Sequence, residues 1–272
     1  MVTTIPGTVE AVLPVLRSAV RLAVVCPMAN EGADAVPFVK EVLRRCDGFA
    51  NATFFAVLDR ANKDNSLDLL REYAVSERRL CVVWAPENRC VVDAYVRGYR
   101  EALAAGADWI LEIDAGFSHQ PEDVPKFFEA MGSGRYDCVF GSRFMAGSRL
   151  SDRSWKRYMV SRGGTLLTNL LLGTRQTDMT SGFQLFSRGA LQMVLRRGIH
   201  SRAHFFQTEM KVHCRGLQIC EVPIHYRAPS PRLGSSAVRE AFRELKRLWL
   251  EQRDGSGASE HAVSHESVTP TE

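Results

Sequence analysis

A single acid ends one of the apolar stretches of this sequence. Residues 108–114 read DWILEID, and the stretch closes on Asp114, with glycine at position 116. A carboxylate at such a position can hold Mg²⁺ or Mn²⁺, and Mg²⁺ commonly takes only one or two protein carboxylates, with substrate phosphates and water completing its shell. A second acid at position 116 would make a metal-binding pair. We therefore expect a weak divalent metal site at Asp114, supported by Ser118, whose metal arrives with a phosphate-bearing ligand.

Polar sequences follow the other apolar stretches in the same way. The sequences concerned are PMANEG (27–32), DRANKDNS (59–66), PENR (86–89), DAGFSHQ (114–120) and GSRF (141–144). Taken singly, such residues are more often helix caps or turn residues than ligands. Ligands of open α/β sheets bind beyond the carboxyl ends of the strands, so the five polar sequences together predict a binding crevice at that edge.

Short apolar stretches alternate with helical stretches from residue 21 onward. The predicted strands cover 21–27, 52–59, 80–86, 108–114 and 136–142, and the predicted helices cover 33–45, 66–76, 91–105 and 122–131. Short β-branched or aromatic runs between helices of this length are typical of βαβ units. We therefore predict an α/β fold in a single domain over 21–235, with a mostly parallel sheet flanked by helices on both faces.

The second half of the chain is less regular. Residues 155–173 have a helical pattern that ends at a glycine, and the polar residues at 178–182 predict a tight, exposed loop. A helix near 204–215 and a strand near 218–225 follow.

Both ends of the chain are expected to lie outside this domain. Residues 1–20 form an N-terminal extension, residues 236–253 an amphipathic helix and residues 254–272 a disordered tail. The apolar positions of the amphipathic helix are Val238, Phe242, Leu245 and Trp249. Such a helix either docks on the domain or lies on a lipid surface.

The composition excludes several classes of protein. The net charge of +4 is spread among acids, which favours anionic small ligands over nucleic acid. The seven cysteines contain no C-x-x-C pair and predict reduced thiols in a cytoplasmic protein; Cys90 and Cys214 lie in more polar sequence, but no His/Asn set accompanies them. No stretch reaches the roughly 18 to 20 apolar residues of a membrane span, so we expect a cytoplasmic protein that at most contacts the inner face of the membrane.

Several longer motifs occur in a fixed order between residues 22 and 236. They are CPMANEG, VLDRANKDNS, IDAGFSHQPEDVPKF, GSRF, SRGGTLLTNLLLG, DMTSGFQLF and FQTEMKVHCRGLQICEVPIHY. Their order and spacing resemble the family 2 glycosyltransferases of the GT-A fold, and most closely the dolichol- or polyprenyl-phosphate mannose (or glucose) synthases. The resemblance implies a nucleotide-sugar donor such as GDP-mannose, UDP-glucose or UDP-N-acetylglucosamine, and a divalent metal, Mg²⁺ or Mn²⁺.

The resemblance also implies which residues bind the donor. Pro27, Asn30 and Glu31 would line the nucleotide pocket. Asp59 would hold the base or the ribose, and Asp114 would bind the sugar diphosphate directly or through the metal.

Another set of matching residues concerns the acceptor. Arg143, Arg157 and Ser161 fall on positions that hold the acceptor's phosphate in the polyprenyl-phosphate enzymes. The implied reaction is inverting: an acceptor oxygen attacks the anomeric carbon while the nucleoside diphosphate leaves from the other face. A phosphate monoester has a second pKa of about 6 and is already ionised near neutral pH, so it needs no general base. The planar guanidinium of arginine suits such a phosphate because it pairs two oxygens at once.

The resemblance places Asp114, Asp178 and Glu209 at the catalytic centre. Asp178 and Gln184 would face the sugar, and Glu209 would contact the sugar or control a conformation. If the acceptor were an amine or a hydroxyl, a base would be needed, for which Asp178, Glu209 and His119 are candidates.

The sequence departs from the family in ways that leave the acceptor open. Gly116 stands where the family usually has a second acid, Arg60 replaces another acid, and GSSA at 234–237 lacks the family's lysine. One alternative is an enzyme that glycosylates polyprenyl phosphate at the membrane face. A second is a soluble tailoring enzyme acting on a small molecule or a carrier-protein-tethered acceptor, and a third is an inactive nucleotide-sugar-binding protein. The first strand does not lead into G-x-G-x-x-G, which disfavours a dehydrogenase.

Overall fold

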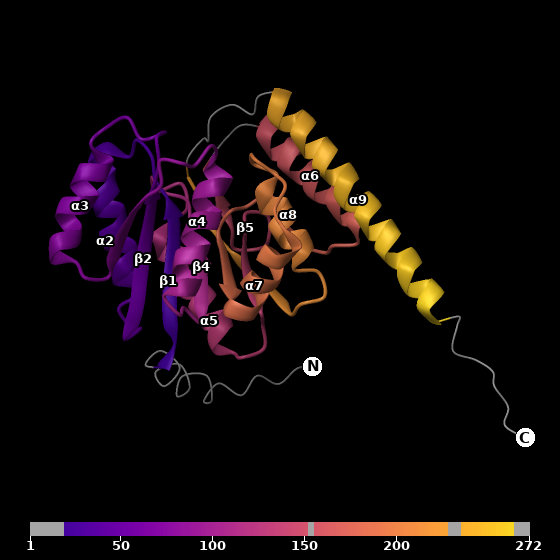
Figure 1. The fold of residues 1–272 in the computed structure, drawn as a ribbon, viewed down its shortest axis with the longest axis horizontal. Helices are drawn as coiled ribbons and strands as arrows, with labels where there is room; N and C mark the ends of the chain where they lie inside the picture. Colours follow the sequence, from indigo (N-terminus) through magenta and orange to yellow (C-terminus); the bar gives the residue numbers. More distant parts are fainter. Residues whose placement is uncertain (1–18, 152–154, 228–234, 264–272) are drawn as a thin grey trace, which may run out of the picture.

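The computed structural model describes residues 19–151, 155–227 and 235–263. Its centre is a seven-stranded sheet with the order β3-β2-β1-β4-β7-β5-β8 (Figure 1). The strands of this sheet are β1 (Arg21–Pro27), β2 (Asn51–Leu58), β3 (Leu80–Trp84), β4 (Trp109–Glu112), β5 (Cys138–Ser142), β7 (Gln184–Ser187) and β8 (Ile219–Pro223). A small second sheet pairs β6 (Arg149–Leu150) with β9 (His225–Tyr226).

All strands of the large sheet except β7 run in the same direction. β1 pairs in parallel with both β2 and β4, whereas β7 lies antiparallel between β4 and β5. The chain first extends the sheet from β1 through β2 to β3, and then places β4 on the other side of β1. Such a reversal opens a crevice beyond the carboxyl ends of the two central strands. The predicted mostly parallel sheet is confirmed.

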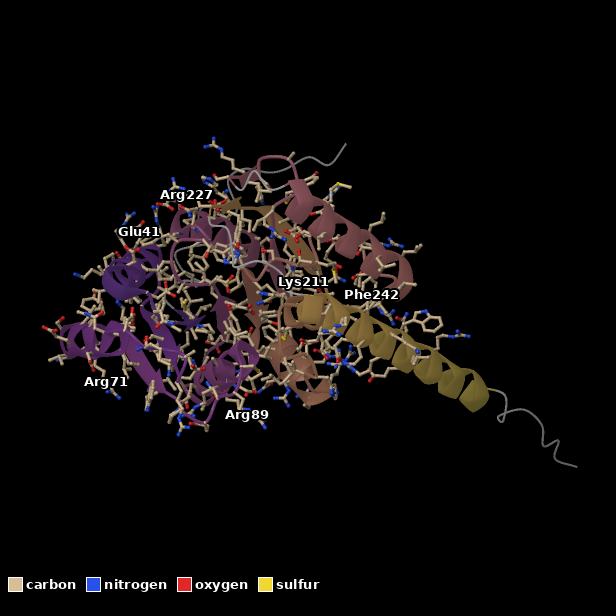
Figure 2. The ribbon with its side chains drawn as sticks, turned by 90° about the horizontal axis from the view of Figure 1, so that it is seen from above. Glu41, Arg71, Arg89, Lys211, Arg227 and Phe242 are labelled. Atoms are coloured by element: carbon tan, nitrogen blue, oxygen red, sulfur yellow. The ribbon has the colours of Figure 1, made fainter. Side chains whose placement is uncertain are left out.

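Helices cover both faces of this sheet, as predicted (Figure 1). One face carries α2 (Ala35–Arg45), α3 (Ser66–Ser76) and α5 (Val124–Gly132), and the other carries α4 (Val91–Ala104), α7 (Arg188–Arg197) and α8 (Phe206–His213). Short 3₁₀ turns precede two of them, η1 (Gly32–Asp34) before α2 and η2 (Pro121–Asp123) before α5. Arg71 on α3 points away from the sheet, whereas Lys211 on α8 lies in the interior (Figure 2).

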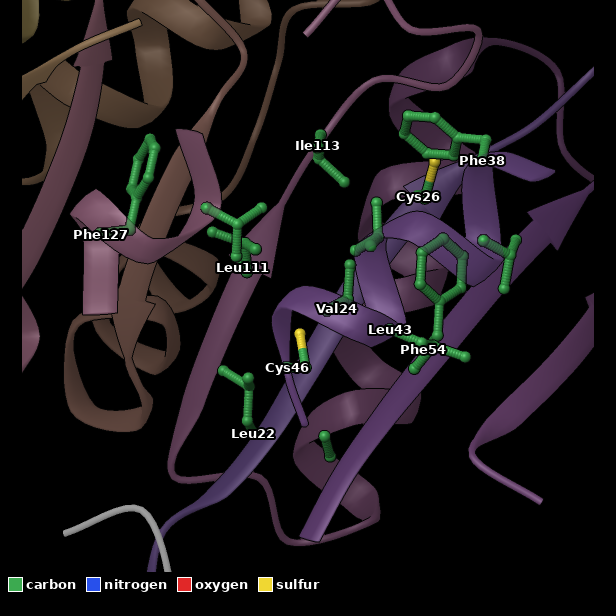
Figure 3. Close-up of a cluster of buried hydrophobic side chains, with 14 of the residues drawn as sticks. Leu22, Val24, Cys26, Phe38, Leu43, Cys46, Phe54, Leu111, Ile113 and Phe127 are labelled. Atoms are coloured by element: carbon green, nitrogen blue, oxygen red, sulfur yellow. The ribbon is translucent and has the colours of Figure 1, made fainter. Parts of the chain in front are cut away.

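Alternate residues of β1 supply the two apolar cores. Leu22, Val24 and Cys26 pack against the face that α2, α3 and α5 cover, a cluster shown in Figure 3. Ala23 and Val25 pack against the opposite face. Successive side chains of a strand point to opposite faces, so a strand buried on both sides must be apolar throughout.

Some expectations need correction. The strand expected at 108–114 ends at Glu112, so Asp114 stands in the loop beyond it. The strand expected near 218–225 is divided between β8 and β9, which belong to different sheets. The seven cysteines have free thiols, but Cys214, which we expected in polar surroundings, is buried with its Sγ 3.7 Å from that of Cys138.

Two long helices, α6 (Trp155–Leu172) and α9 (Ser235–Val263), lie side by side at one end of the molecule (Figure 1). Leu172, Phe205, Leu245 and Leu248 form a small apolar cluster that joins them to the domain. The amphipathic helix is therefore docked, and it continues to Val263 where we expected a disordered tail from residue 254. Among the residues described, no helix has the length and apolar content needed to span a bilayer.

An ion pair also ties α9 to α8. Arg247 donates to the fully buried carboxylate of Glu209, which accepts further hydrogen bonds from the amides of His200 at 3.1 Å and Ser201 at 2.8 Å. Burial alone would raise the pKa of Glu209, but the hydrogen bonds from these two amides outweigh it and lower the pKa to about 2. The charged carboxylate therefore stabilises the folded protein.

We expect Glu209→Gln to lower the free energy of unfolding at pH 7 by about 3 kcal/mol, because it removes the buried charge that pairs with Arg247 and accepts the amides of His200 and Ser201. The folded pKa of about 2 lies below the ordinary value of 4.5, so the wild-type advantage should be present above pH 4.5 and disappear as the pH falls toward 2. Urea unfolding of both proteins between pH 3 and pH 7, at spacings of about one unit, would measure this.

Glu251→Gln is the matched control. Glu251 pairs with the same arginine, but its side chain is 54% exposed, and such surface pairs contribute only about 0 to 1 kcal/mol. A wild-type advantage over Glu209→Gln that does not change with pH would contradict the assignment.

Candidate active site

A cavity of about 1190 Å³ lies at the carboxyl edge of the sheet. All five loops that the sequence predicted at this edge contribute lining residues. Among these residues are Pro27, Glu31, Asp59, Arg89, Asp114 and Arg143. The opposite wall comes from α6, α9 and the segment leading into α8. The expected crevice is therefore a real cavity.

Asp114 is the acid at the centre of the sheet-edge wall. Tyr95 donates a hydrogen bond to Oδ1 of Asp114, and the Asp114 side chain is 42% exposed. Asp114 also lies close to His119, whose Nδ1 is 3.3 Å from the Asp114 amide nitrogen and 3.4 Å from Oδ2. Ser118, the expected second metal ligand, lines the cavity but donates its hydroxyl to the carbonyl of Ala115 at 3.0 Å.

His119 is a poor candidate for the base. The ring is almost fully buried, and burial lowers its pKa, so the imidazole is neutral near pH 7. Its Nδ1 accepts the Asp114 amide hydrogen, which leaves the proton on Nε2. The ring lies against Phe183 and Tyr226, with centroids 5.2 and 5.3 Å away. These contacts make His119 a support for the Asp114 loop.

The loops after β1 and β2 hold each other in place. Asn30 has a φ of +62° and does not line the cavity; its side chain donates to the carbonyl of Ala61 at 2.9 Å and accepts from the amide of Lys63 at 2.7 Å. Asp59, which does line the cavity, accepts the amide of Ala61 at 2.8 Å. The structure therefore gives Asn30 a role in shaping the pocket.

Asp178 forms a buried ion pair with Arg143. The guanidinium donates from Nε at 2.7 Å and from Nη2 at 2.9 Å to the two carboxylate oxygens, and Nη2 also reaches Thr180. Burial alone would raise the pKa of Asp178, but the charge and hydrogen bonds of Arg143 lower it far below its ordinary value. The carboxylate is fully buried and does not line the cavity. The prediction of an exposed loop at 178–182 is therefore wrong, because the ion pair with Arg143 lets the polar Asp178 be buried.

Arg143 itself reaches the cavity. Its pairing with Asp178 uses Nε and Nη2, so within the described part of the chain Nη1 makes no hydrogen bond. Ser161, expected beside it, also lines the cavity. The side chain of Arg157 falls outside the residues that the structure describes.

Two other predicted residues lie away from the cavity wall. Glu209 makes the ion pair with Arg247 described above, and Gln184 lies behind Gln207, to whose side-chain oxygen it donates. Gln207 does line the cavity and donates in turn to Glu112. The motif FFQTEM thus places its glutamine, and not its glutamate, in the cavity wall.

Glu112 and Tyr95 were not anticipated from the sequence. Glu112, the last residue of β4, lies two residues before Asp114 and is fully buried. Burial raises its pKa to about 8 despite hydrogen bonds from Tyr99 and Gln207. At neutral pH this carboxyl is therefore largely protonated. An acid inside the apolar run WILEID was a visible signal for it, whereas nothing in the helix sequence singled out Tyr95.

Comparisons with known proteins identify the family of this chain. Residues 23–195 match the family described as "Glycosyl transferase family 2". Undecaprenyl-phosphate mannosyltransferase of Micrococcus luteus is 30% identical over 202 residues, which are 72% of this chain and 82% of that protein. Polyprenol monophosphomannose synthase of Mycolicibacterium smegmatis is 25% identical over 233 residues, 84% of this chain and 86% of that protein.

Solved structures share the fold. Glucosyl-3-phosphoglycerate synthase from Mycobacterium tuberculosis in complex with UDP superposes with a TM-score of 0.65 at 18% identity, over 91% of this chain and 86% of that one. Its complex with Mn²⁺, UDP and phosphoglyceric acid gives 0.63 at 18% identity, over 91% and 84%. The family match extends over most of the sheet and its loops. This chain therefore belongs to glycosyl transferase family 2 and has the GT-A fold.

Proposed function

We propose that this glycosyltransferase moves a sugar from a nucleotide sugar to the phosphate of a polyprenyl phosphate, with inversion at the anomeric carbon. The observation that carries the proposal is the composition of the cavity, which is polar at the sheet edge and apolar between α6 and α9. The names of the two relatives, an undecaprenyl-phosphate mannosyltransferase and a polyprenol monophosphomannose synthase, favour this acceptor and a mannosyl donor such as GDP-mannose.

The sheet-edge side of the cavity suits the donor. Asp59 and Pro27 line the part nearest to β1 and β2, where the nucleotide would lie. Arg60 and Arg89 line the same side and bring positive charge toward a diphosphate. Asp114 would hold a divalent cation on that diphosphate, and such a cation, when bound, would neutralise the charge that grows on the leaving group.

The opposite side suits a lipid chain. Its apolar lining residues include Met159, Val160, Leu167, Phe205 and Leu245. Arg143 lies where this lining meets the polar side, so it would receive the acceptor's phosphate while the chain lies along α6 and α9.

The outer surface of the same helices supports contact with a membrane. Leu166 and Leu170 on α6 are 71% and 78% exposed, and Phe242 on α9, which also lines the cavity, is 61% exposed (Figure 2). Apolar side chains of this size at the surface, with Arg162 and Arg243 also exposed on these helices, fit an anionic lipid surface. A peripheral position on the membrane would bring the cavity to its lipid substrate.

The state of the acids also fits a phosphate acceptor. Asp178 and Glu209 are held as carboxylates in ion pairs away from the cavity wall, and His119 is neutral with its Nδ1 occupied. A phosphate oxygen is already ionised and can attack the anomeric carbon without giving up a proton. The protein would then accelerate the reaction by binding and orienting the two anionic substrates.

The proposal is tested by incubating the protein with radiolabelled GDP-mannose, UDP-glucose or UDP-N-acetylglucosamine, with polyprenyl phosphate present or absent. We expect label in the lipid extract only when polyprenyl phosphate is present. Transfer only to a water-soluble acceptor would favour the soluble alternative. Donor binding without transfer or hydrolysis would favour an inactive binding protein.

We expect Asp114→Ala to lower the transfer rate by about a hundredfold or more, because it removes the acid that faces the donor's diphosphate. Asp108→Ala is the control: Asp108 lies at the opposite end of the same strand and pairs with Arg21. Initial rates at saturating acceptor measure the effect. Equal rates for wild type and Asp114→Ala would remove Asp114 from the mechanism.

We expect Leu167→Asn to raise the KM for long-chain polyprenyl phosphate about tenfold, because Leu167 is partly buried at the cavity wall and fully burying an apolar side chain, here against the lipid chain, contributes about 1.5 to 3 kcal/mol. The KM for the nucleotide sugar should not change. Leu166→Asn provides the control, since its side chain is exposed and does not line the cavity. The assay uses detergent-solubilised acceptor, and an equal effect of both substitutions would argue against a lipid path along α6.

A further inference from the structure

The space beside Gly116 is already occupied by another acid. A Cβ atom at Gly116 would lie 2.8 Å from Oε2 of Glu31, closer than real Cβ contacts come. Gly116 has a φ of +71°, a backbone conformation that glycine adopts without the steric cost that a Cβ atom would bring. The carboxylate of Glu31 thus stands where the side chain of a residue at position 116 would begin.

Glu31 and Asp114 face the same crevice from neighbouring strands. Glu31 follows β1, Asp114 follows β4, and these two strands pair in parallel at the centre of the sheet. Both residues line the cavity. The crevice between them lies at the point where the strand order reverses, which is where ligands of such sheets bind.

The charges around these two acids are not balanced. Within the described part of the chain, neither Glu31 nor Asp114 forms an ion pair with lysine or arginine, whereas the buried acids Asp178 and Glu209 each do. Two carboxylates that face one cavity without a cation favour the entry of one.

The residues present fit a divalent ion that is only partly held by protein. Among the described residues no group of three or more His, Cys, Asp or Glu side chains could hold a metal, so the chain offers oxygen ligands from two acids at most here. Mg²⁺ accepts such a site when substrate phosphates and water complete its shell.

We infer that Glu31 supplies the second metal-binding carboxylate of this enzyme, in place of the acid that glycine replaces at position 116. The pair Glu31 and Asp114 would bind Mg²⁺ or Mn²⁺ together with the diphosphate of the donor. This inference rests on the proposed function for the identity of the donor as a nucleotide sugar. Glu31 would then be a ligand of the metal, and not the contact of the nucleotide that the resemblance implies.

The test measures Mn²⁺ binding from the EPR signal of free Mn²⁺, with GDP or UDP present and no acceptor. We expect the wild type to bind Mn²⁺ with one of these nucleotides, and Glu31→Gln to bind it about tenfold more weakly or worse. Asp34→Asn removes a nearby surface charge that does not line the cavity, and it should stay within about twofold of wild type. Wild-type Mn²⁺ binding by Glu31→Gln would overturn the inference.

Nucleotide binding in EDTA separates a metal ligand from a nucleotide contact. Glu31→Gln should bind GDP or UDP as the wild type does when no metal is present. A loss of affinity in EDTA as large as the loss with Mn²⁺ would assign Glu31 to the nucleotide and overturn the inference.

A relocation of the acid gives a second test. Glu31→Ala alone should lose Mn²⁺ binding, and the double variant Glu31→Ala/Gly116→Asp should recover it, because removal of Glu31 frees the space beside position 116 and aspartate tolerates a positive φ. Melting temperatures verify that both variants are folded. A folded double variant that binds no Mn²⁺ would overturn the equivalence of the two positions.

The outcomes for the inference and for the proposed function are distinct. Mn²⁺ binding that depends on Glu31, in a protein that transfers no sugar to lipid phosphate, would sustain the inference and refute the function. Transfer to lipid phosphate that proceeds equally in EDTA and in Glu31→Gln would do the reverse.

Discussion

The charged carboxylate of Asp178 has no contact with solvent. The positions of the segments that contact Asp178 depend on the groups that pair with this buried residue. A buried charge is tolerated only when it is paired and hydrogen-bonded. Arg143 supplies the pairing from the end of β5, and buried Lys211 donates to the carbonyl of Asp178 at 2.6 Å. Glu221 on β8 accepts the amide of Asp178 at 3.2 Å. Three separate segments are thereby fixed around one acid.

This balance separates two classes of acid in the molecule. Asp178 and Glu209 are paired with arginine and form parts of the framework, whereas Asp114 and Glu31 face the cavity and have no such partner among the residues that the structure describes. If the enzyme acts on a nucleotide sugar as proposed, Arg60 and Arg89 on the same wall, and a cation bound with the diphosphate, would offset the negative charge of these two acids.

The order of motifs was enough to predict the family, the sheet and the ring of loops at its edge, because these depend on local periodicity and on strand ends. The partners of individual acids were not predictable in this way. Asp178 lies in a polar sequence typical of an exposed loop, and only its pairing with Arg143 draws it inside. Glu209 pairs with Arg247, which lies on α9, 38 residues later in the sequence. The neighbour of Gly116 is likewise set by the pairing of β1 with β4, which no local sequence pattern encodes.

The attachment of α9 has a consequence for motion. The sheet is held by two large apolar cores, whereas α9 joins the domain through one small apolar cluster, the contacts of Arg247 and the carboxylate of Glu240, which accepts the amides of Arg202 and Ala203. Regions with few buried apolar contacts open at a lower free energy than the global unfolding of the domain. We therefore expect α9 to separate from the domain at a lower free energy than the sheet unfolds. If the acceptor is a polyprenyl phosphate, as proposed, its chain would then enter and leave sideways, without a tunnel through which its whole length must pass.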